Sequence, residues 1–482
     1  MNEIIPGLHV SLPELLALLG AVALVVARWL PAAARPRATI AAGAVFLLSA
    51  LVVVVGGLRW QMVPVLAGAA LALPFALSPL LRRRTGRTAW RARWWLALPG
   101  SLACVGLVAT GPVAAWAFPV PVFPAPSGEF AVGTRVLEWT DPDRPETFTA
   151  DPNDQRTVVV QLWYPAQQSP EDARRAQYLG RTEDEARTVA EALARGVGLP
   201  DFLMDGVPRA RTQSVFDAPV ADGRFPVVLF SPGATGVRTQ NTAWAEELAG
   251  HGYVVAALDH PYDSAAVVLA DGRTIGSATV STGDRDQDAV LSVEWTAIRA
   301  ADLGFALTRL EGLDRGEAAD PLTGHLDTSR VAGTGHSMGG AAALQAARQD
   351  RRIDAVVNLD GYPHGPTEPA LDQPTLALTQ AITPATDPRY LPRLTEVLAL
   401  GTATNYRLTV PDSAHLTFMD GPLYLPPVPS IVGSLGRTDS PRVVAETTLA
   451  FLDTVLRDKP GDLADVLSAY GDLEVHHPEK TR

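Results

Sequence analysis

The sequence predicts an α/β fold, a mostly parallel sheet with helices on both faces, preceded by an all-α region of four transmembrane helices. Two observations carry this prediction. Apolar β-like runs alternate with helical patterns over the later part of the chain, which is typical of a parallel sheet. The N-terminal part instead contains four long apolar runs, each able to cross about 30 Å of hydrocarbon as a helix.

The four expected spans make residues 1–118 a transmembrane anchor region. They lie at about residues 12–30, 38–58, 62–81 and 94–118. Only the first contains charged residues, Glu14 and Arg28, and both lie near its ends. A buried helix of a soluble protein is the alternative for one such run, and a cleaved signal peptide for the first, but neither explains four in succession. Because no ionisable residue lies mid-span, nothing indicates an ion pathway.

Arginines set the expected orientation of the spans. The first connection is flanked by three arginines and the third contains six, whereas the second has only Arg59. Since positively charged connections stay in the cytoplasm, both chain termini are expected outside it. The prediction is therefore a multi-pass protein of the cell membrane. A stiff Pro-rich linker, 119–127, then leads to an extracytoplasmic domain at 128–460 and a loosely ordered tail at 461–482.

Charge and cysteine content exclude several classes of function. Residues 1–125 have a net charge of +8 and the remaining residues a net charge of −20. Such an acidic domain repels phosphate backbones, so no nucleic acid partner is expected. Cys104 is the only cysteine, which excludes an intramolecular disulfide and a thiolate metal cluster.

The expected elements of the large domain alternate in type along the chain. Strands are expected at 157–165, 225–233, 253–261, 330–335, 353–361, 374–380 and 405–415, and helices at 244–252, 288–313, 338–349 and 440–456. Residues 167–215 are polar and helix-prone, and too charged to present an apolar lid.

A G-x-S-x-G motif, residues 335–339, lies between an expected strand and an expected helix. In that context the motif predicts a nucleophile elbow. Its glycines keep side chains out of a cramped turn, so that the hydroxyl of Ser337 is exposed. The N-terminus of the following helix points its dipole at a developing oxyanion. A glycine-rich turn with a bystander serine is the alternative interpretation.

A serine nucleophile needs a base, and behind an elbow the acid and then the histidine follow in the chain. His415, after the last expected strand, is the candidate base, and His364 is expected to line the pocket. Asp360 ends the strand after the elbow helix and is the preferred acid. Asp387, after the next strand, is the alternative acid.

The oxyanion hole requires two backbone N–H groups. One comes from Met338, the residue after the nucleophile. The other is expected from Ala234, in the loop "FSPGATG" that follows an earlier strand.

These stretches resemble the secreted-type platelet-activating-factor acetylhydrolases and their bacterial α/β-hydrolase relatives. The resemblance runs over about Gly128–Leu456 and rests on residues 225–264, on "GHSMGG", on the strand ending in "LDG", and on "DSAHLTFMD". It implies an α/β-hydrolase fold with a triad of Ser337, Asp360 and His415. It also implies a calcium-independent esterase acting on short or oxidised acyl groups of phospholipids.

One departure keeps other functions open. Pro232 stands where many relatives carry His, and bacterial polyester hydrolases and cutinases share "SPG" and "GHSMGG". Cutinase-like polyesterase activity, with Asp387 as acid, is therefore an alternative. Long-chain lipase activity is another, as is a peptidase or thioesterase on the same triad. An alternative of another class is a non-catalytic membrane protein with a degenerate hydrolase domain. For the esterase, the expected partners are a small-molecule or lipid ester and the bilayer, with no metal or organic cofactor.

Overall fold

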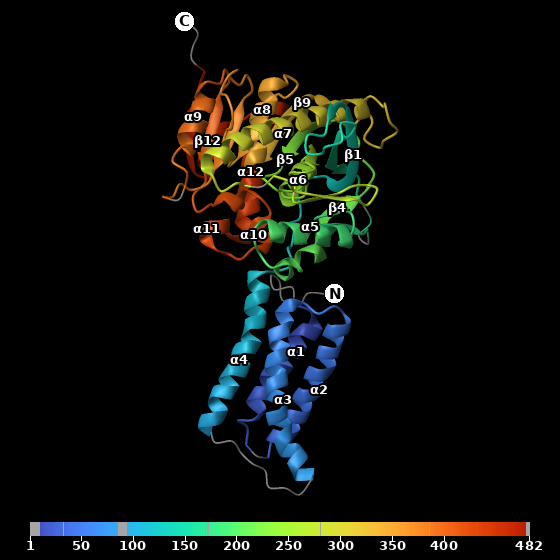
Figure 1. The fold of residues 1–482 in the computed structure, drawn as a ribbon, viewed down its shortest axis with the longest axis vertical. Coiled ribbons are helices and arrows are strands. Elements are labelled where there is room, and N and C mark those ends of the chain that lie inside the picture. The colour runs from blue at the N-terminus through green and yellow to red at the C-terminus, as the bar shows by residue number, and fades with distance from the viewer. Residues whose placement is uncertain are drawn as a thin grey trace. The chain divides into compact units, whose positions relative to one another are not determined.

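The computed structural model divides the chain into two compact units (Figure 1). One consists of Met1–Pro121 with Phe202–Gly206, and the other of Val122–Asp201 with Val207–Arg482. The structure describes residues 10–31, 33–84, 94–168, 170, 173–279, 281–384 and 386–478.

The first unit contains the four expected apolar helices. They are α1 (Leu12–Ala27), α2 (Arg35–Val55), α3 (Val63–Arg84) and α4 (Trp94–Ala117), with a 3₁₀ turn, η1 (Trp60–Met62), before α3. Among the described residues, three helices are long and apolar enough to cross a membrane, whereas α1, with 16 residues, is shorter than the expected span. The expected third connection, 82–93, lies largely outside the described residues.

Close helix contacts and one ion pair hold this unit together. Gly20 packs on the backbone of Phe46, where an added Cβ would lie 3.0 Å from its atoms. Glu14 caps α1 through Ser11 and also lies 3.5 Å from the guanidinium of Arg59, with both charged side chains buried. These charges are tolerated away from water because they are paired.

The second unit is built on an 11-stranded sheet of order β13-β12-β11-β10-β9-β5-β6-β2-β1-β4-β3. Its strands are β1 (Ala131–Pro145), β2 (Gln155–Ala166), β3 (Arg175–Gln177), β4 (Arg211–Phe216), β5 (Phe225–Ser231), β6 (Val254–Asp259), β9 (Leu326–His336), β10 (Ala355–Leu359), β11 (Thr375–Thr379), β12 (Asn405–Thr409) and β13 (Asp472–His476). The run from β6 to β12 is parallel throughout. A separate antiparallel ribbon pairs β7 (Ala266–Val268) with β8 (Thr274–Gly276).

Helices cover both faces of this sheet, as the sequence predicts. The helices of this unit are α5 (Glu183–Gly196), α6 (Thr242–Gly250), α7 (Arg285–Asp314), α8 (Met338–Gln349), α9 (Tyr390–Ala399), α10 (Gly421–Tyr424), α11 (Pro429–Val432), α12 (Gly436–Arg457) and α13 (Leu463–Ser468). One buried apolar cluster joins α7 and α8 to the sheet, and a second joins α6 and α12 to it. The parallel strands therefore end at one edge, where loops can carry functional side chains together.

The expectation of a loose tail at 461–482 is wrong for most of its length. Residues 463–468 form α13, and β13 pairs antiparallel with β12 along five residue pairs from Asn405↔His476. The reason is that Leu463 and Leu467 are buried in the core shared with α12. The polar composition of the segment hides these two anchoring side chains.

Candidate active site

Ser337 occupies a sharp turn between the end of β9 and the start of α8. Its backbone has φ 56° and ψ −122°, a strained conformation for a residue with a side chain. Its N–H donates to the carbonyl of Leu359 at 2.9 Å. The flanking positions must be glycine: a Cβ on Gly335 would lie 2.2 Å from Gly339, and one on Gly339 would lie 1.9 Å from the oxygen of Ser231.

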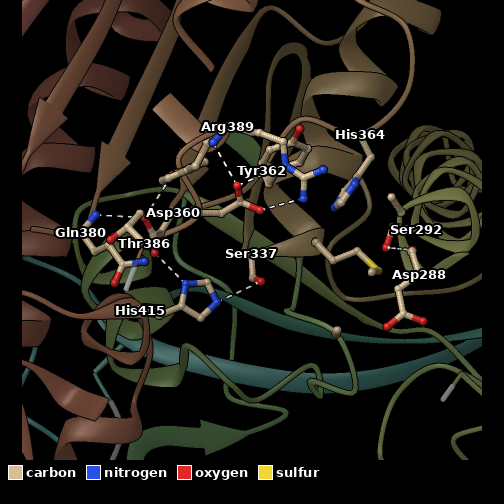
Figure 2. A pocket seen from close by; sticks show the side chains of 15 residues that line it. Asp288, Ser292, Ser337, Asp360, Tyr362, His364, Gln380, Thr386, Arg389 and His415 are labelled. Carbon is tan, nitrogen blue, oxygen red and sulfur yellow. Dashed lines mark hydrogen bonds and ion pairs between the residues drawn. The ribbon is translucent and has the colours of Figure 1, made fainter. Parts of the chain in front are cut away.

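The structure brings Ser337, His415 and Asp360 together (Figure 2). His415 begins the 3₁₀ turn η4 (His415–Phe418) after β12, and its Nε2 lies 3.0 Å from the Ser337 Oγ. Its Nδ1 lies 2.6 Å from Oδ2 of Asp360, which directly follows β10. Since a carboxylate only accepts hydrogen bonds, Nδ1 carries the proton and Nε2 faces the serine as an acceptor.

The other oxygen of Asp360 is held by two donors that the sequence reasoning missed. Oδ1 accepts the backbone N–H of Gln380 at 2.9 Å and the hydroxyl of Tyr390 at 3.0 Å. Tyr390 begins α9 and is buried, and burial together with the nearby carboxylate raises the pKa of its phenol well above the usual value. Tyr390 therefore stays protonated and donates to the carboxylate.

The alternative acid, Asp387, has a different partner. Its carboxylate accepts the backbone N–H of Arg389 at 2.9 Å and pairs with the guanidinium of the same residue, also at 2.9 Å. The structure therefore places Asp360, rather than Asp387, in hydrogen-bonding contact with His415.

A cavity of about 440 Å³ lies over the serine. Ala234 and Met338 line it together with Ser337 and His415, and Met338 is the first residue of α8, so its N–H has no acceptor within the helix. His364 also lines the cavity, as expected, and lies on the side of Ser337 away from His415 (Figure 2). Burial lowers the pKa of His364 to about 4, so its imidazole is neutral.

His336, inside the G-x-S-x-G motif, joins separate parts of the site. Its Nε2 lies 3.0 Å from the backbone oxygen of His415, and its Nδ1 lies 3.0 Å from the side-chain amide of Gln240. Burial, and then the neighbouring His415, lower the pKa of His336 to about 3. The neutral ring therefore donates from Nε2 and accepts at Nδ1. The oxygen of the same Gln240 amide accepts the N–H of Gly233, at 3.1 Å.

Among the residues that the structure describes, no group of three or more His, Cys, Asp or Glu side chains is placed to hold a metal ion. The arrangement can instead move a proton between serine and imidazole beside backbone donors.

The sheet order and the strained serine between β9 and α8 define the second unit as an α/β hydrolase. The family described as platelet-activating factor acetylhydrolase, isoform II, matches residues 117–464. The chain belongs to this family, which confirms the resemblance seen in the motifs.

Similar proteins include esterases of several kinds. A "Probable 1-alkyl-2-acetylglycerophosphocholine esterase" of Arthroderma benhamiae is 29% identical over 50% of this chain and 59% of its own length. "Cutinase 1" of Thermobifida cellulosilytica is 26% identical over 33% of this chain and 48% of its own. Among solved structures, a ferulic acid esterase from Streptomyces cinnamoneus matches with a TM-score of 0.57 and 30% identity, over 73% of this chain and 98% of that one. The match thus spans about half to three fifths of these curated relatives.

Proposed function

We propose that the chain is a membrane-anchored serine esterase that hydrolyses short-chain carboxylic esters of lipids or phospholipids, in the manner of platelet-activating factor acetylhydrolases. The observation that carries the proposal is the unbroken chain of contacts from Ser337 through His415 to Asp360 beneath a cavity. Family membership and the esterase relatives support it.

In the proposed first step, His415 Nε2 takes the proton of Ser337 while Oγ forms a bond to the ester carbonyl carbon. The carbonyl π electrons move to its oxygen, which the N–H groups of Met338 and Ala234 stabilise. The oxyanion then collapses, the bond to the alcohol oxygen breaks, and His415 returns the proton to that leaving alcohol. Asp360 holds the ring tautomer and stabilises the imidazolium.

The second step hydrolyses the acyl-enzyme. His415 takes a proton from water as its oxygen bonds to the acyl carbon, and the same N–H pair stabilises the second oxyanion. Collapse breaks the bond to the Ser337 Oγ, which recovers its proton from His415, and the carboxylic acid leaves. The proposed cycle needs no metal or organic cofactor.

A preference for short acyl chains follows from the lining of the cavity. A long acyl chain gains about 0.8 kcal/mol for each methylene buried, but only against an apolar wall. Several side chains interrupt this lining with polar or charged groups, as do those of Asp288, His364, Gln380 and Arg389. The cutinase relatives keep polyesterase activity as a second candidate.

The test is ester hydrolysis combined with covalent labelling. We expect kcat/KM on p-nitrophenyl acetate and butyrate to exceed that on octanoate and palmitate, and a fluorophosphonate probe to label the protein. Ser337→Ala should abolish both labelling and turnover, whereas Ser468→Ala, at an exposed position of α13, should retain both. An unlabelled, inactive wild-type protein would favour a degenerate hydrolase domain, and a steady rise toward palmitate would favour a lipase.

A further inference from the structure

Arg299, on α7, is completely buried beneath the loop that follows β5, although no step of the proposed reaction uses it. Its guanidinium donates to the backbone oxygens of Pro232, at 2.5 Å, and Gly233, at 3.0 Å. Two further bonds, at 2.5 and 2.7 Å, join it to the two carboxylate oxygens of Asp263. The planar guanidinium thus binds two consecutive peptide carbonyls, while the carboxylate of Asp263 holds the guanidinium in place.

Arg299 and the N–H of Gly236, at 2.9 Å, both donate to the Gly233 oxygen, and the direction of this carbonyl determines where the next N–H points. The Gly233–Ala234 peptide is trans, and in a trans peptide the C=O and N–H bonds point in opposite directions. Because the Gly233 oxygen faces Arg299, the N–H of Ala234 faces the other way. Ala234 lines the cavity above Ser337, where the second oxyanion donor is required.

We propose that Arg299 is the positioning residue of the oxyanion hole, which orients the Ala234 N–H through the carbonyls of Pro232 and Gly233. This inference rests on the proposed esterase function. The guanidinium charge also lies at the carbonyl end of the same peptide. It therefore adds to the positive potential that the N–H presents to a developing oxyanion.

Surrounding contacts hold Arg299 and the loop that carries Ala234 in position. Asp263 also lies 3.4 Å from the N–H of Thr235, so one carboxylate holds both the guanidinium and the far end of the loop. Burial alone would raise the pKa of Asp263, but the neighbouring Arg299 holds it below its usual value, so the acid remains ionised. On the opposite side, Gln240 holds the N–H of Gly233. The Pro232–Gly233 peptide is thus held through both its carbonyl and its N–H, and the next peptide, which carries the donor, is held through the Gly233 carbonyl.

The test is the substitution Arg299→Lys, which removes the planar guanidinium but keeps the positive charge. Lysine offers its donors from a single nitrogen and cannot bind two carbonyls and both oxygens of Asp263 at once. Loss of one oxyanion donor costs about 10²–10³ in rate. For Arg299→Lys, where the donor is misoriented rather than removed, we expect kcat to fall by about 10- to 100-fold with KM changed by less than about 3-fold.

A trifluoromethyl ketone separates positioning from a loss of folded protein. Ser337 Oγ adds to its carbonyl carbon, the proton passes to His415, and the carbonyl oxygen becomes an oxyanion in the hole. Its Ki should therefore rise in parallel with the fall in kcat/KM. A merely structural role would lower the active fraction, counted by titration with a fluorophosphonate, without changing Ki.

Arg156→Lys is the matched control. Arg156 is nearly as buried and bonds to Asp302, Glu146 and the oxygen of Pro261, but it does not contact residues 232–234. We expect it to lower the melting temperature while Ki per active site stays within about 3-fold of the wild-type value.

If Arg299→Lys does not fold, Asp263→Asn loosens the guanidinium instead, and a smaller rise in Ki is expected. Wild-type kcat and Ki in either folded variant would overturn the role of Arg299 while leaving the esterase proposal intact. An inactive, unlabelled wild-type protein would instead defeat the proposed function itself.

Discussion

At the scale of single residues, the contacts of Asp360 distinguish it from other carboxylates around the cavity. One oxygen accepts from His415 and the other from Gln380 and Tyr390, at distances of 2.6 to 3.0 Å. An ionised carboxylate only accepts, so these three donors hold it in one orientation. That orientation keeps the proton of His415 on Nδ1 and leaves Nε2 free to act on Ser337.

We predict that Asp360→Asn lowers kcat by about 10⁴, the loss that the equivalent change causes in a well-studied serine protease, because an amide can donate and favours the wrong imidazole tautomer. Asp387→Asn is the comparison, and its loss should be at least 10-fold smaller because Asp387 pairs with Arg389. The measurement is kcat on p-nitrophenyl butyrate per titrated site, with circular dichroism as the check on folding. A larger loss for Asp387→Asn would indicate a cutinase-like arrangement.

At the scale of secondary-structure elements, the expectations from sequence succeed in the centre of the sheet and fail at its edges. The expected strands correspond to β2, β5, β6 and β9 to β12. Most of these strands are almost entirely buried, so their sequences are nearly continuous apolar runs that can be recognised as strands. The missed strands of the sheet are β1, β3, β4 and β13, and both strands of the ribbon, β7 and β8, are missed as well. Except for β1 these strands are short, β1 is buried over only part of its length, and β13 has no buried residue. These segments form strands because they pair with a neighbouring strand, and amino-acid composition does not reveal such pairing.

The same contrast explains which site residues can be predicted. Ser337, His415 and Asp360 each follow a recognisable strand, so chain order and the elbow motif are enough to find them. Arg299 donates to the carbonyl of Gly233, 66 positions away in the chain, and Tyr390 donates to the carboxylate of Asp360, 30 positions away. Nothing in the local pattern around them indicates those partners, since only the packing of α7 and α9 brings them to the site.

His336 joins the end of β9 to η4, and this junction should make stability depend on pH. Its pKa is about 3 in the folded protein and about 6.5 when unfolded, so the unfolded state binds more protons between these values. Stability therefore rises with pH across this window and is lost as the pH falls. From this one residue we predict about 2 kcal/mol less stability at pH 5 than at pH 7.5.

The measurement is the free energy of unfolding in urea at the two pH values. His336→Gln, which removes the titrating ring but keeps a donor, should reduce the difference by about 2 kcal/mol. His477→Gln, at an exposed position, is the control and should leave the difference unchanged. An unaltered difference in His336→Gln would contradict the assignment of a neutral, buried ring.

At the scale of the whole molecule, the chain joins an apolar unit with a net positive sequence to an acidic α/β hydrolase. Three helices of the first unit could span a membrane by length and composition. The arginines cluster at the first and third connections between the helices, which favours a cytoplasmic location for both. Because an even number of spans returns the chain to its starting side, four spans would place the hydrolase outside the cytoplasm with the N-terminus. With three spans, the two would lie on opposite sides.

The last prediction uses the single native cysteine to test this topology. Cys104 is buried in α4, and Cys104→Ser gives a background for introducing one cysteine at a time. Asn153→Cys, at an exposed position of the hydrolase, should react with a membrane-impermeant maleimide on intact, wall-stripped cells. Thr85→Cys, among the arginines of the third connection, should react only after the cells are permeabilised, because loops rich in arginine are retained in the cytoplasm.

A third variant decides the role of the short helix α1. Cysteine at Asn2 should react on intact cells if α1 crosses the membrane, and only after permeabilisation if it does not. Labelling at Thr85 but not at Asn153 on intact cells would show the opposite orientation, with a hydrolase that acts on cytoplasmic esters. Equal labelling of all three only after permeabilisation would mean that none of these positions lies outside the cytoplasm, because a hydrocarbon barrier between two positions must give them different access to a charged reagent.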